Sequence, residues 1–388
     1  MHLFAADELH QITYVITERF IMNILFENGM ILQRDEQGRY SAIPRGYRGV
    51  KDNQIAYIGT SAPSESYEQH RDMTGKLLMP GLINAHGHAA MTLLRGVGSG
   101  LPLHRWLNEA IFPIEAKMVP EDIVAGTRWA IMEMLASGTT ACSEMYDFPW
   151  AAAQVFADAG MKANLGRVML CFDPSMKAED CQRLQECDTV IKHYDGMGGG
   201  LIKAEWAPHS EYLTTENTMT ALALMAHHYS SNIQIHVSET KAEHEECKQR
   251  RGGMTPVQYL KKIGVLNTPT YMAHCVWLED EDLAILKECG ATLVHNPTSN
   301  MKLGSGFAPI AKALEMGVNV ALGTDGCASN NNLNMFEEMH LAALLQKGLH
   351  NDPTLVTADQ VLDMATVSGA KALGRPDTGM LCEGMKAD

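Results

Sequence analysis

Short apolar segments alternate with longer amphipathic ones over most of this chain, from residue 77 to about residue 373. The apolar segments have the length of strands, whereas segments such as 121–136 and 215–229 place apolar residues every three or four positions, as helices do. Eight strands are predicted, at residues 77–85, 138–146, 163–170, 201–207, 232–237, 269–274, 291–296 and 318–324. Helices between successive strands imply parallel pairing, and eight such units favour a closed (β/α)8 TIM-type barrel over an open sheet.

A different pattern precedes the barrel segments. From Met22 to about Gly59 short alternating runs are separated by turn signals such as Glu27-Asn28-Gly29, which is typical of a small β layer. We therefore expect a small β-sandwich-like second domain. The predicted division of the chain is residues 1–21, an extension outside the fold; 22–76, the first part of the β domain; 77–374, the barrel; and 375–388, a return to the β domain that looks cut short.

Composition limits the number of domains, the partners and the location that this protein can have. The 388 residues, 46% of them hydrophobic, suffice for one large domain and a smaller one. A net charge of −15 argues against nucleic acid or an anionic membrane as a partner. No apolar run approaches the roughly 20 residues of a membrane span, and the start lacks the pattern of a secretory signal. The nine cysteines include no CxxC pair, so we expect reduced thiols and a cytoplasmic location.

Histidines and one aspartate recur where the predicted strands end. His86 and His88 follow the first strand, His236 and His274 end the fifth and sixth, and Asp325 follows the eighth. The carboxyl ends of barrel strands meet at one face, which is where such barrels carry their active sites. Imidazoles with a carboxylate form a site that zinc accepts, and an open position there activates water. The pattern predicts one divalent metal ion per chain, with Zn²⁺ favoured, and a hydrolase.

Two of these residues and a nearby glutamate also suggest proton chemistry. Glu239 lies three residues after His236, where a carboxyl group beside a metal ligand is placed to carry a proton to a substrate. Asp325 can bind the metal and accept a proton from its water. His274 can bind the metal or orient the attacking oxygen, and the sequence leaves both roles open. His295 ends the seventh strand before Asn-Pro and is interpreted as a turn-building residue.

Several longer stretches carry a resemblance to a known family. The chain resembles the amidohydrolase superfamily, and within it the 5-methylthioadenosine/S-adenosylhomocysteine deaminases. The matching stretches are PGLINAHGH (80–88), FPIE (112–115), APHS (207–210), HVSET (236–240), AHCV (273–276), HNPTSNMKLG (295–304) and GTDGCASNN (323–331). Some relatives of this architecture bridge two metals with a modified lysine on the fourth strand. Lys203 lies early in that strand, far from its carboxyl end, so one metal ion is expected.

The resemblance also implies roles for individual residues. It implies metal ligands at His86, His88, His236 and Asp325, a proton carrier that contacts the substrate at Glu239, and a hydroxide-orienting role for His274. Substrate binding is implied for three further residues. These are Glu115, expected to bind the ribose hydroxyls; His209; and Arg167, expected to meet the substrate's tail, with Arg183 as its rival.

The expected function is hydrolytic deamination of a 6-aminopurine nucleoside to its 6-oxo form and ammonia. The nucleoside is of the 5-methylthioadenosine, S-adenosylhomocysteine, adenosine or 5-deoxyadenosine type. One alternative is an aminohydrolase or chlorohydrolase acting on another heterocycle, such as a triazine, guanine or cytosine. A second alternative is a catalytically inactive scaffold of the same fold. The expected partner is a small-molecule substrate, and association into a homo-oligomer stays open.

Overall fold

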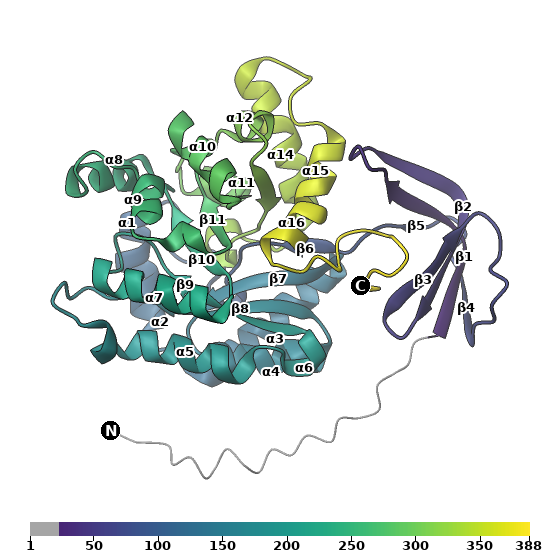
Figure 1. Ribbon diagram of the computed structural model, residues 1–388, viewed down its shortest axis with the longest axis horizontal. Coiled ribbons are helices and arrows are strands. Elements are labelled where there is room, and N and C mark those ends of the chain that lie inside the picture. The colour runs from purple at the N-terminus through teal and green to yellow at the C-terminus, as the bar shows by residue number, and fades with distance from the viewer. Residues whose placement is uncertain (1–22) are drawn as a thin grey trace, which may run out of the picture. The chain divides into compact units, whose positions relative to one another are not determined.

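The computed structural model describes residues 23–388 (Figure 1). The described residues fall into two compact units. The smaller unit contains residues 23–33, Ala42–Leu78 and Leu381–Ala387, and the larger contains Arg34–Ser41, Met79–Met380 and Asp388. The extension predicted for residues 1–21 lies outside the described residues. The predicted domain boundaries remain a prediction.

The smaller unit is built on one mixed sheet. Its strands are β1 (Asn23–Arg34), β2 (Tyr40–Lys51), β3 (Gln54–Gly59), β4 (Gln69–Asp72) and β5 (Leu77–Leu78). The order is β3-β2-β1-β4, with β5 also paired to β1. Ile31, Val50 and Ile55 are buried in this unit and supply its apolar core. The chain returns to it near residue 385, where Ile55 N donates to Met385 O at 2.8 Å.

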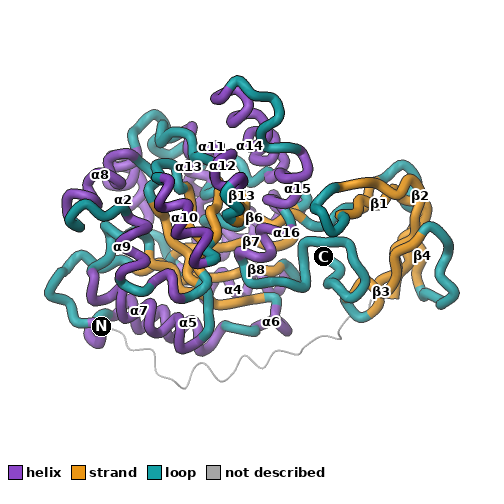
Figure 2. Tube along the Cα trace, turned by 45° about the horizontal axis from the view of Figure 1, so that its top comes forward, coloured by secondary structure: helices purple, strands orange, loops and turns teal. Residues whose placement is uncertain are grey.

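The larger unit is the predicted (β/α)8 barrel, which is confirmed. Its strands are β6 (Leu82–Asn84), β7 (Thr139–Tyr146), β8 (Lys162–Met169), β9 (Ile202–Pro208), β10 (Ile233–Val237), β11 (Thr270–His274), β12 (Thr292–His295) and β13 (Asn319–Leu322). Each strand pairs in parallel with the next one along the chain. Ala85 N donates to Leu322 O at 2.8 Å, a bond that joins the first barrel strand to the last. Helices surround these strands (Figure 2).

One predicted strand is divided in the structure. The run predicted at 77–85 breaks at Pro80, which lacks the N–H that a continuous sheet ladder needs. Leu77 and Leu78 therefore form β5 in the smaller sheet, where Leu77 pairs with Met30. Only Leu82–Asn84 enters the barrel as β6. The apolar pattern alone does not reveal this break. Each half joins the sheet that contains the strand with which it pairs.

The remaining elements are mostly helices on the outside of the barrel, and the predicted helices at 121–136 and 215–229 are α3 and α7. The α-helices are α1 (Leu103–Arg105), α2 (Phe112–Glu115), α3 (Pro120–Ala136), α4 (Pro149–Ala159), α5 (Gln182–Tyr194), α6 (Met197–Gly200), α7 (Glu216–Tyr229), α8 (Lys241–Arg250), α9 (Pro256–Lys262), α10 (Asp280–Cys289), α11 (Pro297–Lys302), α12 (Ile310–Glu315), α13 (Cys327–Asn330), α14 (Met335–His350), α15 (Ala358–Ala365) and α16 (Val367–Ala372). Short 3₁₀ turns are η2 (Ala89–Leu94), η4 (Ala178–Asp180) and η5 (Val265–Asn267), and a π-helical segment, η3, spans Trp106–Ile111. Among the described residues, no helix has the length and apolar character required to cross a membrane.

Single residues explain where helix α7 begins and how the first and last barrel strands can approach each other. At the start of α7, Thr215 accepts a hydrogen bond from Thr218 N, which satisfies one of the unpaired N–H groups at the helix N-terminus. Gly323 follows β13, and a Cβ at this position would lie 2.8 Å from His86 N. Because only glycine permits that approach, the last strand can end directly beside the segment that follows the first.

Candidate active site

The ends of three barrel strands, β6, β10 and β13, bring the four predicted metal ligands together. The ring of His86 lies 4.9 Å from that of His88 and 4.8 Å from that of His236, measured between centroids. One ligand atom from each of these three residues lies within 4.8 Å of the others. Asp325 Oδ1 lies 3.6 Å from His86 Nε2 and 3.2 Å from His88 Nε2. Three imidazoles and a carboxylate thus converge on one point.

The hydrogen bonds of the histidines fix which nitrogen faces that point. His88 Nδ1 lies 2.6 Å from Met145 O, and His236 Nδ1 lies 2.8 Å from His209 O. A carbonyl only accepts, so both Nδ1 atoms carry the proton and both Nε2 atoms keep a free lone pair. His86 Nε2 is buried and has no hydrogen-bond partner among the described residues. A buried lone pair without a donor is costly, and a divalent cation is the group that these atoms fit.

Asp325 is held in place by two hydroxyl groups. Ser299 Oγ and Ser329 Oγ donate to its Oδ2 at 2.6 and 2.7 Å. Its backbone is left-handed, with φ of 62°, a conformation that residues with a Cβ rarely adopt. Burial alone would raise the pKa of Asp325, but its close contact with the imidazoles of His86 and His88 holds that pKa well below its usual range. The group is therefore an ionised carboxylate, the form that binds a metal.

Glu239 and His274 lie beside this cluster. His274 Nε2 is 3.7 Å from Glu239 Oε2 and 4.0 Å from Asp325 Oδ2. The other ring nitrogen, Nδ1, is 2.8 Å from Asn300 Oδ1, an acceptor that fixes the orientation of the ring. Burial raises the pKa of Glu239. A carboxyl group with a raised pKa is better able to hold and deliver a proton at neutral pH.

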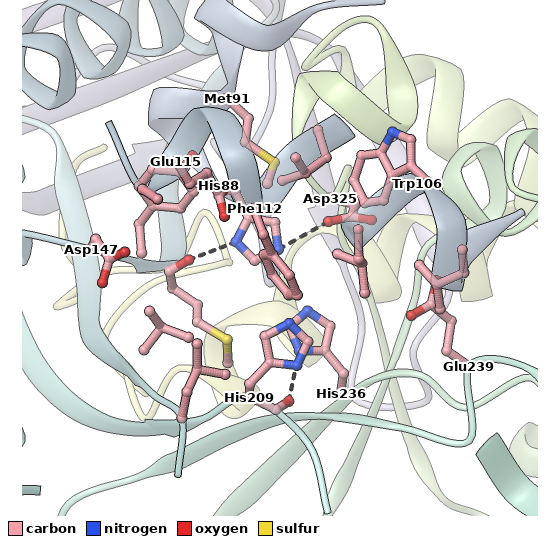
Figure 3. A pocket seen from close by; sticks show the side chains of 18 of the residues that line it. His88, Met91, Trp106, Phe112, Glu115, Asp147, His209, His236, Glu239 and Asp325 are labelled. Atoms are coloured by element: carbon pink, nitrogen blue, oxygen red, sulfur yellow. Dashed lines mark hydrogen bonds and ion pairs between the residues drawn. The ribbon is translucent and has the colours of Figure 1, made fainter. Parts of the chain in front are cut away.

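These side chains open into one cavity of about 310 Å³. His209 follows β9 and stacks on His236, with ring centroids 4.4 Å apart. Glu115 ends α2 on the cavity wall, where burial raises its pKa. Figure 3 shows Glu115 and Glu239 on opposite sides of the labelled histidines. The cavity therefore presents Glu115 on one side of the cluster and Glu239 on the other.

The structure places Arg183, rather than Arg167, on the cavity wall. Successive side chains of a strand point to opposite faces, and Val168 of β8 lines the cavity, so its neighbour Arg167 points away. Arg167 Nε donates to Glu186 Oε2 at 2.8 Å, and its guanidinium also pairs with Asp147. Arg167 is thus not among the residues that line the cavity, whereas Arg183 is.

Comparison with known proteins agrees with this geometry. The model of the amidohydrolase family matches residues 77–388. The chain belongs to the amidohydrolase family. It is 44% identical to 5-methylthioadenosine/S-adenosylhomocysteine deaminase of Acetivibrio thermocellus, over 95% of this chain and 84% of that protein. It is 43% identical to 5′-deoxyadenosine deaminase of Methanothermobacter thermautotrophicus, over 89% and 80% respectively.

A solved structure is similar over nearly the same length. The zinc-bound adenosine deaminase of Xanthomonas campestris superimposes with a TM-score of 0.87 at 32% identity, covering 95% of this chain and 84% of that one. The resemblance inferred from the motifs is thus confirmed. The site of this amidohydrolase fits a divalent ion by its donor set, as its own hydrogen bonds indicate.

Sequence reasoning missed the apolar wall of the cavity. Trp106, Leu107 and Ile111 line it from the π-helical segment, and Phe172 lines it from the loop after β8. No motif marks these residues, and a π-helical turn has no reliable pattern in sequence. Other missed residues had a signal. Ser299, Asn300 and Ser329 all lie inside the stretches that carried the family resemblance.

His295 and Lys203, which the sequence analysis considered as possible site residues, lie outside the cluster of ligand atoms. His295 is buried, and neither of its ring nitrogens has a hydrogen-bond partner among the described residues, so no side-chain hydrogen bond supports the expected turn-building role. Burial lowers its pKa to about 3, which makes the ring neutral. Lys203 Nζ donates to Gly374 O, and Lys203 is absent from the residues that line the cavity. This contact is consistent with the expectation that Lys203 bridges no metals.

Proposed function

We propose that this protein hydrolyses the 6-amino group of a purine nucleoside, which yields the 6-oxo nucleoside and ammonia. The substrate is of the 5-methylthioadenosine, S-adenosylhomocysteine, adenosine or 5′-deoxyadenosine type. The names of relatives at 43–44% identity support this substrate class. The observation that carries the proposal is the cavity that joins the histidine cluster, Glu239 and Glu115.

The metal site is formed by His86, His88, His236 and Asp325. Zn²⁺ is the favoured ion, because nitrogen and oxygen ligands suit it and a similar structure holds zinc. When bound, the ion supplies a Lewis acid that makes a water molecule nucleophilic near neutral pH. The protein contributes the charge of Asp325 and the fixed orientation of the imidazoles.

Three side chains then handle protons and orientation. Glu239 donates a proton to N1 of the purine as the water oxygen adds to C6. Asp325 accepts a proton from that water, and His274 orients its oxygen through a ring that Asn300 holds. Glu239, now ionised, takes the proton of the C6 hydroxyl and passes it to the amino group, which allows the C–N bond to break, and the proton on Asp325 returns to Glu239 for the next turnover. Ammonia leaves, and the product keeps a carbonyl at C6 and a proton at N1.

The other side of the cavity would hold the sugar. Glu115 is proposed to accept hydrogen bonds from the two ribose hydroxyls, which a carboxylate can do with both oxygens. His209 is proposed as a further substrate contact, supported by its stacking on His236. Arg183 takes the role of contacting the substrate's tail, because it lines the cavity and Arg167 does not.

A substrate panel tests this function. Purified protein is assayed for ammonia release from adenosine, 5′-methylthioadenosine, 5′-deoxyadenosine, S-adenosylhomocysteine, guanine, cytosine and triazines. We expect activity on one or more of the nucleosides and much weaker activity on the free bases. Activity confined to free bases or triazines would contradict the nucleoside assignment and keep the wider aminohydrolase activity. If protein that holds metal releases ammonia from none of these compounds, the proposal that it is a deaminase is wrong.

The proposal extends to location and partners. All nine cysteines are free, which suits a reducing cytoplasm. The substrate is a small molecule. Association into a homo-oligomer stays a prediction that size-exclusion chromatography with light scattering would test.

A further inference from the structure

Glu243 is a buried carboxylate for which the proposed reaction has no role. It lies in the first turn of α8 and is 7% exposed. Its Oε1 accepts a hydrogen bond from Ser238 N at 2.8 Å, and its Oε2 accepts one from Glu239 N at 2.7 Å. Both oxygens are thus bonded to successive backbone amides. The second amide belongs to the residue proposed to carry the proton.

The peptide segment that Glu243 binds has a sterically unfavourable backbone conformation at Ser238. Ser238 is fully buried and has φ of 48°, in the left-handed region that residues with a Cβ rarely adopt. Such a backbone persists only where surrounding bonds hold it. Ser238 O accepts from Val276 N and Trp277 N, each at 3.1 Å, just beyond His274. The short segment before Glu239 therefore joins the loop after β10 to the loop after β11.

The helix itself directs Glu243 toward this segment. Thr240 precedes α8, and its hydroxyl accepts from Glu243 N at 3.2 Å, which fixes the first turn. From the third helical position, the side chain of Glu243 reaches back to the amides before the helix. The next residue, His244, adds a second contact, since its Nδ1 lies 3.0 Å from Ser238 Oγ. Two adjacent buried side chains of α8 thus fix one peptide.

We propose that Glu243 is a positioning residue for the deamination: by binding the amides of Ser238 and Glu239, it holds the Glu239 carboxyl group at the distance from the substrate that proton transfer requires. This inference rests on the proposed function. Glu243 touches neither substrate nor metal and acts through Glu239. Proton transfer is sensitive to misplacement of a fraction of an ångström to an ångström, so the loss of one bond should be visible in turnover.

The variant that tests this is Glu243→Gln. An amide has the same shape but only one acceptor oxygen, so its NH₂ group would face one of the two backbone N–H groups, donor against donor. We expect kcat to fall by about 10–100-fold, KM to change by less than about threefold, and metal content to stay at one ion per chain. Glu245→Gln makes the same change at an exposed position of the same helix and should leave all three values unchanged.

A double-mutant cycle separates positioning from general damage. If Glu243 acts through Glu239, then Glu239→Gln already removes the group that it positions. The double variant Glu239→Gln, Glu243→Gln should therefore be within about threefold of Glu239→Gln alone, because residues that act as a unit are not additive. If Glu243→Gln fails to fold, Glu243→Asp keeps the charge but is too short to reach both amides, and it enters the same cycle.

Each other outcome overturns the inference. A kcat of Glu243→Gln within twofold of wild type, a loss of bound metal, or losses that multiply in the double variant would show that Glu243 does not position Glu239. A wild-type protein that releases no ammonia from any nucleoside would refute the proposed function, and this inference with it. Active wild-type protein with multiplying losses would refute the role of Glu243 alone.

Discussion

The pKa values of two neighbouring carboxyl groups in this cavity, Glu239 and Asp325, are shifted in opposite directions, and their immediate contacts explain why. Burial raises the pKa of Glu239, whereas the contact of Asp325 with two histidine rings outweighs burial and lowers the pKa of Asp325. One group therefore holds a proton more readily and the other stays ionised, which is the division of work that an acid–base reaction at a metal requires. Residue type alone does not assign these roles. The atoms that surround each carboxyl group do.

The proposed proton transfer predicts a specific kinetic defect for Glu239→Gln. The amide cannot deliver a proton to N1, so kcat should fall by roughly 10²–10⁴-fold, the usual contribution of general acid–base catalysis. Metal content should stay at one ion per chain, because Glu239 is not among the proposed ligands. Steady-state kinetics and elemental analysis of the same preparation test both statements. Loss of metal in this variant would make Glu239 a ligand instead.

The substrate assignment predicts a different defect for Glu115→Ala. Each lost charge-assisted hydrogen bond to the ribose should cost about 1.5–3 kcal/mol, so kcat/KM for nucleosides should fall by roughly 10–100-fold or more. Metal content and any weak activity on free bases should be unchanged. Glu121→Ala, at an exposed position of α3, is the control. Normal nucleoside kinetics in Glu115→Ala would contradict the ribose contact.

At the scale of elements, the barrel places ligands from distant parts of the chain at one face. Segments after β6 and β13, together with β10, carry the four proposed ligands, and the bond between Ala85 N and Leu322 O joins the first strand to the last. The helices have a different task. Segments η3 and α2 form a cavity wall, and α8 approaches the loop that carries Glu239. Parallel strands fix the metal site, and the connecting segments shape what surrounds it.

The convergence of strand ends predicts that removing one ligand empties the site. His88→Ala should lower the metal content from about one ion per chain to well below one and abolish turnover, because three remaining ligands bind zinc more weakly than four. His340→Ala, at an exposed position of α14, should leave the metal in place. Elemental analysis after dialysis measures this without reference to activity. Full metal content in His88→Ala would remove His88 from the ligand set.

At the scale of the whole molecule, a buried polar network crosses the inside of the barrel. Glu205 of β9 accepts from Gln234 Nε2 at 2.7 Å and from Asn164 Nδ2 at 2.9 Å, and Tyr271 OH also donates to it. Asn164 Oδ1 in turn accepts from Arg375 Nε at 2.9 Å. These bonds connect several strands with the segment after α16. Such a network is stable only when its members are paired, so it specifies how the barrel is assembled.

This network predicts a pH-dependent stability. Burial raises the pKa of Glu205 from its usual 4.5 to about 7. An acid whose pKa is raised on folding destabilises the folded state as pH rises from the unfolded pKa to the folded one. The stability of wild type relative to Glu205→Gln should therefore decrease between about pH 5 and 7, by about 2 kcal/mol, and level off above. Urea unfolding of both proteins at pH 5, 6, 7 and 8 measures the difference.

Glu121→Gln makes the same change at an exposed position of α3 and serves as the control for that series, measured by urea unfolding at the same pH values. A constant difference between wild type and Glu205→Gln would show that Glu205 does not titrate between pH 5 and 7.

The sequence by itself determined the order of strands and helices, the parallel barrel and the candidate ligands at its strand ends. Apolar periodicity records which residues are buried, and the ends of parallel strands must meet at one face. What the tertiary structure decided depends on neighbours that are distant in sequence. The two halves of the apolar run around Pro80 become separate strands, because the first half pairs with β1 and the second enters the barrel. Arg167 points away from the cavity because its neighbour Val168 points into it.

The same reason explains the residues that sequence reasoning missed. Nothing in the local pattern around Glu243 distinguishes it from an exposed helical glutamate such as Glu245, since both lie in a polar stretch of one helix. Only the folded chain brings the Glu243 carboxylate against the amides of Ser238 and Glu239. A periodic pattern indicates which face of an element is buried. Which atoms that face meets, and therefore which pKa is shifted and which side chain is held, follows from packing alone.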